Sequence, residues 1–148
     1  METTENYEQL KLENQICFPL YAASRLVTRL YQPLLDELGL TYPQYLVLLV
    51  LWEHNGLTVN QVGDRLHLHS NTLTPLLKRL EQQGLLQRRR STTDERLVQL
   101  MLTPEGNSLK KKAACIPSQL AAAADLPPDK ALALKALLEE LLQKHPSW

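Results

Sequence analysis

The 148-residue sequence predicts a mainly α-helical protein with a small β-wing, in which a winged helix-turn-helix region lies between helical segments. Two short amphipathic runs follow one another closely between Thr58 and Gln83, as the two helices of a helix-turn-helix do. Two β-compatible runs come next and end before Thr103, with a polar loop between them, as a hairpin requires. These observations together predict the fold class.

The chain is expected to form one unit with two regions. Residues 42–102 would make the winged helix-turn-helix, and residues 8–38 and 103–145 a helical dimerisation region. With 44% apolar and 22% charged residues, the chain is long enough to bury one core. It has no apolar run of about 18 residues, and its start, METTENYEQL, is polar. We therefore expect no membrane span, no secretory signal and a cytoplasmic protein.

Two helices are predicted before the helix-turn-helix. The first would begin near Pro19 and run to residues 36–38, because apolar side chains recur along it and Gly39 can end it. The second, from about Pro43 to His54, is apolar on nearly all sides, which is typical of a helix buried on several sides.

The helix-turn-helix is predicted from its caps and its apolar faces. Thr58 is placed to cap the first helix, and Ser70 to cap the second, which Gly84 would end. One face of the second helix is a leucine stripe. The other carries hydrogen-bonding and cationic side chains of the kind that read base edges and hold phosphates in a major groove. These candidate DNA-binding residues are Ser70, Asn71, Thr72, Thr74, Pro75, Lys78 and Arg79.

The wing is predicted from LLQRRR and RLVQLML, which the loop STTDE joins. Asp94 lies close enough in sequence to brace Arg96 by an ion pair. Residues 61–100 contain seven basic and four acidic residues, a net charge of +3 in a chain whose formal net charge is zero. An arginine run alone is usually a solvated face, but beside this helix pair it favours contact with DNA. The arginines expected at the minor groove or its phosphates are Arg88, Arg89, Arg90 and Arg96.

Two more helices are predicted after the wing. Thr103 and Pro104 read as the cap and first-turn proline of a helix that runs to about Ala124, and a last helix follows Pro128. Both are rich in leucine and alanine and, like the first helix, lack a partner in so small a chain. We therefore expect a twofold homodimer. Such a dimer would present two recognition helices to double-stranded DNA with a palindromic operator.

The order of these elements resembles the multiple antibiotic resistance regulator (MarR) family, as do LTVNQVGDRL, SNTLTPLLKRLEQQGLLQR and the wing element DER. The likeness spans almost the whole chain. Two longer stretches, LENQICFPLYAASR and YQPLLDELGLTYPQYLVLLVLWE, resemble more narrowly its organic hydroperoxide resistance regulator (OhrR) branch. The resemblance implies a dimeric repressor that senses organic hydroperoxide with one N-terminal cysteine.

Matching motifs carry the family's sensing site onto this chain. The resemblance implies that Cys17 is the sensing thiol and that Tyr31 and Tyr42 of the partner subunit form hydrogen bonds with it. Tyr21 would lie nearby. Peroxides react with thiolate, which the amides at a helix start stabilise, and Cys17 lies near such a start. Its apolar sequence neighbours would suit an organic peroxide. A lone cysteine in apolar surroundings is more often inert packing, but the tyrosine motifs favour a sensor.

Cys115 is the candidate resolving thiol. Oxidised Cys17 would be a sulfenic acid, which condenses with a thiol within reach. The resemblance to two-cysteine members of the branch implies a disulfide between subunits. A disulfide requires Cα atoms within about 7 Å. If the reduced thiols are farther apart than this, the helices must move, and this movement would turn the recognition helices away from their grooves. The alternative is that Cys115 is only a small residue buried among alanines.

Three other interpretations compete with this one. His67 and His69 alternate in the turn, but no third ligand of matching spacing is evident, so no metal or cofactor is expected. A thiol peroxidase would need an activating histidine or arginine beside its cysteine, and none is close in sequence, so we expect no enzyme. A repressor released by a small phenolic ligand would keep the same DNA-binding residues and is the main alternative.

Overall fold

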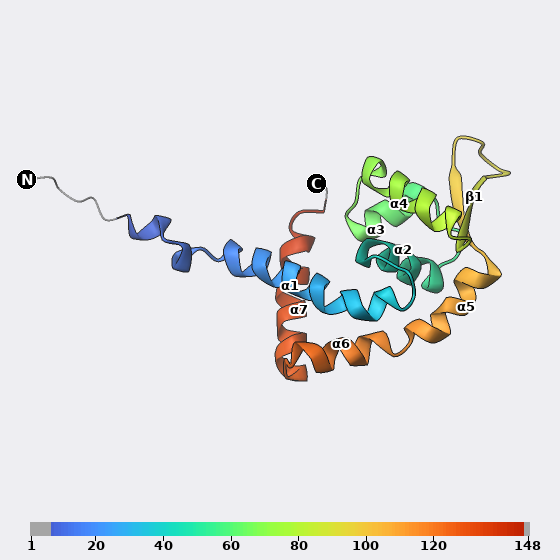
Figure 1. Ribbon diagram of the computed structural model, residues 1–148. Helices are drawn as coiled ribbons and strands as arrows, with labels where there is room; N and C mark the ends of the chain where they lie inside the picture. Colours follow the sequence, from blue (N-terminus) through green and yellow to red (C-terminus); the bar gives the residue numbers. More distant parts are fainter. Residues whose placement is uncertain (1–6, 147–148) are drawn as a thin grey trace, which may run out of the picture.

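The computed structural model describes residues 7–146, which form a helical chain with one two-stranded sheet (Figure 1). This confirms the predicted fold class. Residues 1–6, the start of the polar segment considered above for a secretory signal, lie outside the described residues. The elements in order are η1 (Glu8–Leu10), η2 (Leu12–Asn14), α1 (Cys17–Asp36), α2 (Tyr42–Glu53), α3 (Val59–Leu66), α4 (Ser70–Gln82), β1 (Leu86–Arg90), β2 (Val98–Leu102), α5 (Pro104–Ala113), α6 (Ile116–Ala124) and α7 (Pro128–Gln143).

Capping boxes begin α2 and α3. The Thr41 hydroxyl accepts a hydrogen bond from the Gln44 amide at 3.4 Å, and the Gln44 side chain accepts one from the Thr41 amide at 2.9 Å. Thr58 and Gln61 repeat this exchange at 3.2 and 2.8 Å. The two boxes satisfy amides that would otherwise be unpaired at each helix start. The predicted cap at Thr58 is confirmed.

Two predicted helix starts were wrong by one or two residues. The first helix begins at Cys17, two residues before Pro19. A proline is tolerated in the first turn of a helix, because the amide that it lacks would have no partner within the helix there. Ser70 is the first residue of α4 and not its cap. The cap position belongs to His69, whose carbonyl accepts from the Thr72 amide at 3.0 Å, and no side chain caps this helix.

The helix predicted from Thr103 to Ala124 is in fact two. Thr103 caps it as expected, since its hydroxyl accepts from the Gly106 amide at 3.0 Å. However, α5 ends at Ala113 and α6 begins at Ile116. Pro117 accounts for the break, because a proline ring clashes with the carbonyl four residues earlier, here that of Ala113.

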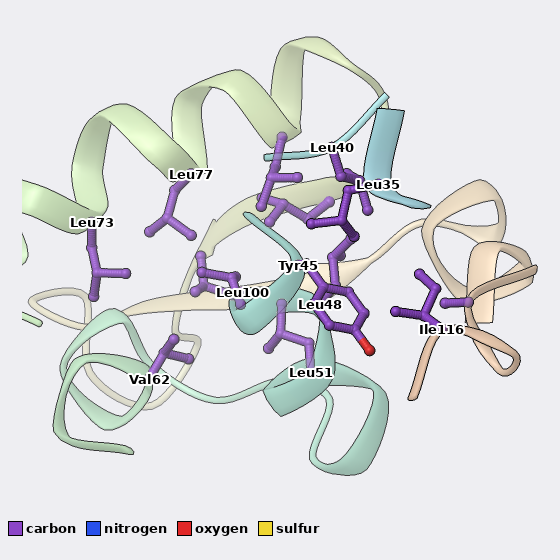
Figure 2. Packing of buried hydrophobic residues seen from close by; sticks show 14 residues of the cluster. Leu35, Leu40, Tyr45, Leu48, Leu51, Val62, Leu73, Leu77, Leu100 and Ile116 are labelled. Atoms are coloured by element: carbon purple, nitrogen blue, oxygen red, sulfur yellow. The ribbon is translucent and has the colours of Figure 1, made fainter. Parts of the chain in front are cut away.

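The core is centred on α2, which is buried on several sides as predicted. The end of α1, the leucine stripe of α4, the sheet and the α5–α6 junction pack around it (Figure 2). Leu76, expected in the α4 stripe, is only partly buried. The buried apolar residues are Leu35, Leu40, Tyr45, Val47, Leu48, Leu51, Val62, Leu73, Leu77, Leu80, Leu86, Leu100, Ala113 and Ile116.

The antiparallel sheet is fixed at its base. Leu86 lies opposite Leu102, and Arg90 opposite Val98. The Leu100 amide donates to the carbonyl of Leu57 at 2.8 Å, which ties β2 to the loop before α3. The wing therefore leaves the helix-turn-helix from a rigid base.

Much of the helical surface outside this core is left uncovered by the residues that the structure describes. No residue of α7 is buried, and Leu132 on it is 68% exposed. At the start of α1, Ile16 is 85% exposed. The two 3₁₀ helices and the beginning of α1 project from the rest of the chain (Figure 1). Within residues 7–146, no helix combines the length and apolar character needed to cross a membrane.

Candidate nucleic-acid interface and thiol sites

The outer face of α4 is fully presented to solvent. Leu73, Leu77 and Leu80 hold the helix on the core. Every α4 residue proposed above for DNA binding is exposed on the other side. Thr74 donates its hydroxyl to the Ser70 carbonyl at 2.7 Å, so its proton is used within the helix. The face thus offers amide, hydroxyl and cationic groups in a convex row, which suits a major groove.

The wing tip is ordered by local hydrogen bonds. Ser91 is buried, and its hydroxyl accepts from the amides of Thr93 and Asp94 at 3.3 and 3.4 Å. The Ser91 amide donates to the Leu97 carbonyl at 2.9 Å, and the Leu97 amide donates to the Asp94 carbonyl at 3.0 Å. These bonds close the loop between the strands.

Asp94 holds Arg96 as predicted. The Arg96 Nε lies 3.1 Å from Oδ1 of Asp94, and the Arg96 amide donates to the same oxygen at 3.1 Å. Hydrogen bonds from the Arg96 side chain and backbone lower the pKa of Asp94, so the carboxylate stays ionised at neutral pH. The Arg96 side chain is nevertheless 90% exposed. Its guanidinium is thus oriented without being covered.

Arg88 has a role that sequence alone did not indicate. Its Nε donates to Glu81 at 2.9 Å and its amide to the same carboxylate at 3.3 Å. Hydrogen bonds from the Arg88 backbone and then its side chain lower the pKa of Glu81. Glu81 lies in the last turn of α4, so Arg88 fastens the wing to that helix. Arg90 is exposed at the far end of β1, and Arg89 donates to Gln87 at 2.6 Å.

Cys17 is the first residue of α1 and is exposed. Phe18 and Ile16 beside it are exposed as well, so within one chain they do not enclose the thiol in the expected apolar setting. Tyr21 lies one turn further along, and Arg25 another turn on. The Arg25 guanidinium donates to the Tyr21 hydroxyl at 3.4 Å and lies 5.6 Å from the ring centroid. A four-residue spacing places all three groups on one face of α1, and this spacing is the signal that identifies Arg25.

The side chains of Tyr31 and Tyr42 lie together within one chain. Their ring centroids are 4.6 Å apart. Tyr45, which we had not singled out, lies 5.7 Å from Tyr31 and 6.5 Å from Tyr42. Burial, with smaller contributions from Tyr42 and Tyr45, raises the pKa of Tyr31 to about 12, and burial also raises the pKa of Tyr42. Both phenols are therefore neutral hydrogen-bond donors at neutral pH.

Cys17 cannot contact this tyrosine pair within one chain. Cys17 and Tyr31 lie on the same continuous helix, and the helical rise from residue 17 to residue 31 is about 21 Å. Any contact between the thiol and the pair must therefore join two copies.

Cys115 lies at the break between α5 and α6, where it occupies the cap position of α6. It is exposed, and its thiol donates to the Lys112 carbonyl at 3.4 Å. The alternative of a buried packing residue is therefore wrong. The helix break that Pro117 imposes is what leaves this sulfur at the surface.

No metal site is formed by the described residues 7–146, in which no three His, Cys, Asp or Glu side chains gather to hold an ion. His67 adopts a left-handed backbone, with φ of 53°, where α3 ends. Its position is thus part of the turn between α3 and α4.

Comparison with known proteins places the chain among transcriptional regulators. A family model described as "Transcriptional regulator SarA/Rot" matches residues 29–113. The chain is 54% identical over 144 residues to the organic hydroperoxide resistance transcriptional regulator of Bacillus subtilis (strain 168), covering 94% of this chain and 97% of that one. It is similar to reduced AbfR bound to DNA, at 42% identity and a TM-score of 0.76, over 93% and 96% of the two chains. Against disulfide-formed AbfR the identity is 40% and the TM-score 0.60, over 93% and 90%.

Proposed function

Because this chain belongs to the MarR family of transcriptional regulators, in the organic hydroperoxide resistance branch, we propose that it is a dimeric repressor released from DNA by oxidation of Cys17. Members of this family are regulators, so the chain is not an enzyme. The proposal has three parts: the DNA contact, the sensing site and the switch.

The observation that carries the proposal is the unequal likeness to two states of one relative. The chain matches reduced, DNA-bound AbfR with a TM-score of 0.76 and the disulfide form with 0.60, although the sequence identity is nearly the same. The difference therefore reflects how the elements are arranged. It supports a reduced arrangement that suits DNA and a disulfide-linked arrangement that differs from it.

For the DNA contact, we assign α4 to the major groove and the exposed wing arginines Arg90 and Arg96 to the adjacent minor groove. The candidate α4 residues all lie on the exposed side of that helix. At the wing tip, Asp94 orients Arg96. The uncovered leucines of α7 and the exposed start of α1 support packing against a second copy. Two copies related by a twofold axis would read the two halves of a palindrome.

For the sensing site, we assign Cys17 of one subunit to the Tyr31 and Tyr42 pair of the other. The length of α1 supports this assignment, because it prevents the contact within one chain. The two neutral phenols would donate hydrogen bonds to the thiolate and stabilise the anion. Tyr21, one turn from the sulfur and oriented by Arg25, would add a third hydroxyl.

The chemistry is oxidation of sulfur by the peroxide. The Cys17 thiolate attacks the terminal oxygen of the hydroperoxide, the O–O bond breaks, and the alkoxide takes up a proton and leaves as the alcohol. Sulfur is oxidised to a sulfenic acid and the peroxide is reduced. A Cys115 thiolate of the partner subunit then attacks this sulfur, hydroxide leaves as water, and a disulfide forms.

The proposal is tested by binding of the reduced protein to its own upstream DNA, for the wild type and Cys17→Ser. We expect both to bind, and about one equivalent of cumene hydroperoxide to release only the wild type, with binding restored by dithiothreitol. If both proteins stay bound after the peroxide, oxidation is not the signal. A small phenolic ligand would then be the next candidate.

The role of Cys115 is tested on a nonreducing gel. We expect peroxide-treated wild-type protein to run as a crosslinked dimer, and Cys115→Ser to run as a monomer because its sulfenic acid has no protein thiol to condense with. The Cys17→Ser protein serves as the matched control, since it lacks the thiol that is oxidised first. An undiminished dimer band from Cys115→Ser would show that a disulfide to Cys115 is not the product.

A further inference from the structure

We propose that Tyr45 and Trp52 form a mechanical link between the tyrosine pair and the base of the wing, so that a shift of Tyr31 or Tyr42 moves the DNA-binding hairpin. The inference rests on the proposed function, in which the tyrosine pair binds the oxidisable sulfur. It adds two positioning residues that touch neither the sulfur nor DNA.

The first step is the packing of four aromatic rings. Tyr45 is 2% exposed and contacts the tyrosine pair on one side. On its other side lies Trp52, at 6.3 Å between centroids and in an edge-to-face arrangement. Tyr45 and Trp52 are separated by two turns of α2 and share one face of it. An open pocket that Tyr45, Trp52 and Lys110 help to line adjoins these rings, so it is the direct ring contacts that pass a displacement of the pair through Tyr45 to Trp52.

The second step joins Trp52 to α5. Its indole N–H donates to the carbonyl of Gly106 at 2.9 Å, across 54 residues of sequence. The Lys110 ammonium donates in turn to the backbone carbonyl of Trp52 at 3.3 Å. Side chain and main chain of one tryptophan are thus both bound to α5. This helix follows directly after the second strand of the wing.

The third step joins the start of α5 to both wing strands. Gly106 is buried against Leu85, so closely that a Cβ at position 106 would overlap the Leu85 carbonyl oxygen. The Thr103 amide donates to that same oxygen at 3.1 Å, and the Thr103 hydroxyl donates to the Gly84 carbonyl at 2.5 Å. Leu85 and Thr103 directly adjoin the paired ends of β1 and β2. The first turn of α5 and the base of the wing therefore move as one body.

The hydrogen bond between Trp52 and Gly106 distinguishes this link from ordinary core packing. A phenylalanine at position 52 would retain an aromatic ring against Tyr45, but it has no N–H to donate. Trp52→Phe consequently separates the two roles, since it preserves the packing and removes the bond to α5.

The test compares operator binding by wild type and Trp52→Phe before and after cumene hydroperoxide, together with the rate of Cys17 thiol loss. We expect thiol loss at the wild-type rate. The ratio of oxidised to reduced Kd should fall about fivefold for each subunit, the size of one hydrogen bond, and so about 25-fold for the dimer. Gln83→Leu is the matched control. It removes a comparable side-chain bond, to the Gly39 carbonyl at 2.9 Å, and leaves every contact of the three steps in place. Its Kd ratio should stay at the wild-type value.

If Trp52→Phe does not fold, Lys110→Gln tests the same link. Lys110 is exposed, and its substitution removes only the hydrogen bond from the Lys110 ammonium to the Trp52 carbonyl. We expect a smaller fall in the same ratio. The link is wrong if the folded variants of Trp52 and Lys110 are released as fully as the wild type. Failure of peroxide to release the wild type itself would instead overturn the proposed function.

Discussion

An Arg96→Ala protein is expected to bind the operator about 100-fold more weakly than the wild type, because a lost DNA contact costs about tenfold in each of two subunits. The guanidinium projects from the wing tip and is held there by Asp94. Binding measured at several salt concentrations should also show the slope of log K against log salt falling in magnitude by about two, one for each arginine lost from the dimer. An unchanged slope would place Arg96 away from the phosphates.

Asp94→Ala separates orientation from net charge. Removing a carboxylate makes the wing more positive, so a purely electrostatic wing would bind DNA more tightly. The structure predicts weaker binding instead, because Asp94 accepts three hydrogen bonds from Arg96, two from the side chain and one from the backbone. The sign of the change in Kd therefore decides between the two accounts. Arg96→Lys should fall between wild type and Arg96→Ala, because it keeps charge but loses the planar fork.

Gly106→Ala is expected to lower the free energy of unfolding by about 3 kcal/mol, at the upper end of the range for overpacking. Alanine normally stabilises a helix more than glycine does, so a large loss of stability requires a specific steric clash. Here that clash is with backbone, since the new Cβ would overlap the carbonyl oxygen of Leu85, and the start of α5 would have to leave the wing. Urea unfolding at a fixed protein concentration measures the change.

Gly39→Ala is the control for this substitution. Gly39 has a φ of +67°, but nothing lies within 4 Å of a Cβ placed there. Its loss should cost only the strain of a left-handed backbone, about 1 kcal/mol. If both variants unfold at the same urea concentration, the close approach of Gly106 to Leu85 is not what the protein depends on.

Sequence predicted the elements well where their signals were local. Thr58 and Thr103 were correctly assigned as caps, because a capping side chain bonds an amide only three residues away. Ser70 was assigned wrongly, because the chain enters the helix one residue earlier, through His69, with no side-chain cap. The break before α6 was missed, although Pro117 is visible in the sequence. The lysines and alanines at 110–114 and the alanines at 121–124, on either side of this proline, favour a continuous helix.

The sequence predicted which residues belong to the candidate site, but not which distant residues bond to one another. The exposed residues of α4 follow from helical periodicity, and the pairing of Asp94 with Arg96 from their proximity in sequence. The ion pair of Glu81 with Arg88 depends on how the wing folds back on α4. The bond from Trp52 to Gly106 joins two elements far apart in sequence, and only the packed structure brings them together. Tyr45 was overlooked because an aromatic residue in an apolar helix is normally only core.

The tyrosine cluster also sets how the protein tolerates alkali. In the folded chain the Tyr31 phenol keeps its proton until about pH 12, whereas in the unfolded chain it ionises near the ordinary value of 10.0. The stability that this neutral phenol contributes is therefore complete below pH 10.0 and is lost as the pH rises toward 12. At every pH below about 10, Tyr31 therefore remains a neutral hydrogen-bond donor. In the sensing contact that we propose, a change of pH within that range would leave this donor unaltered, so the response to peroxide would be separate from any response to alkali.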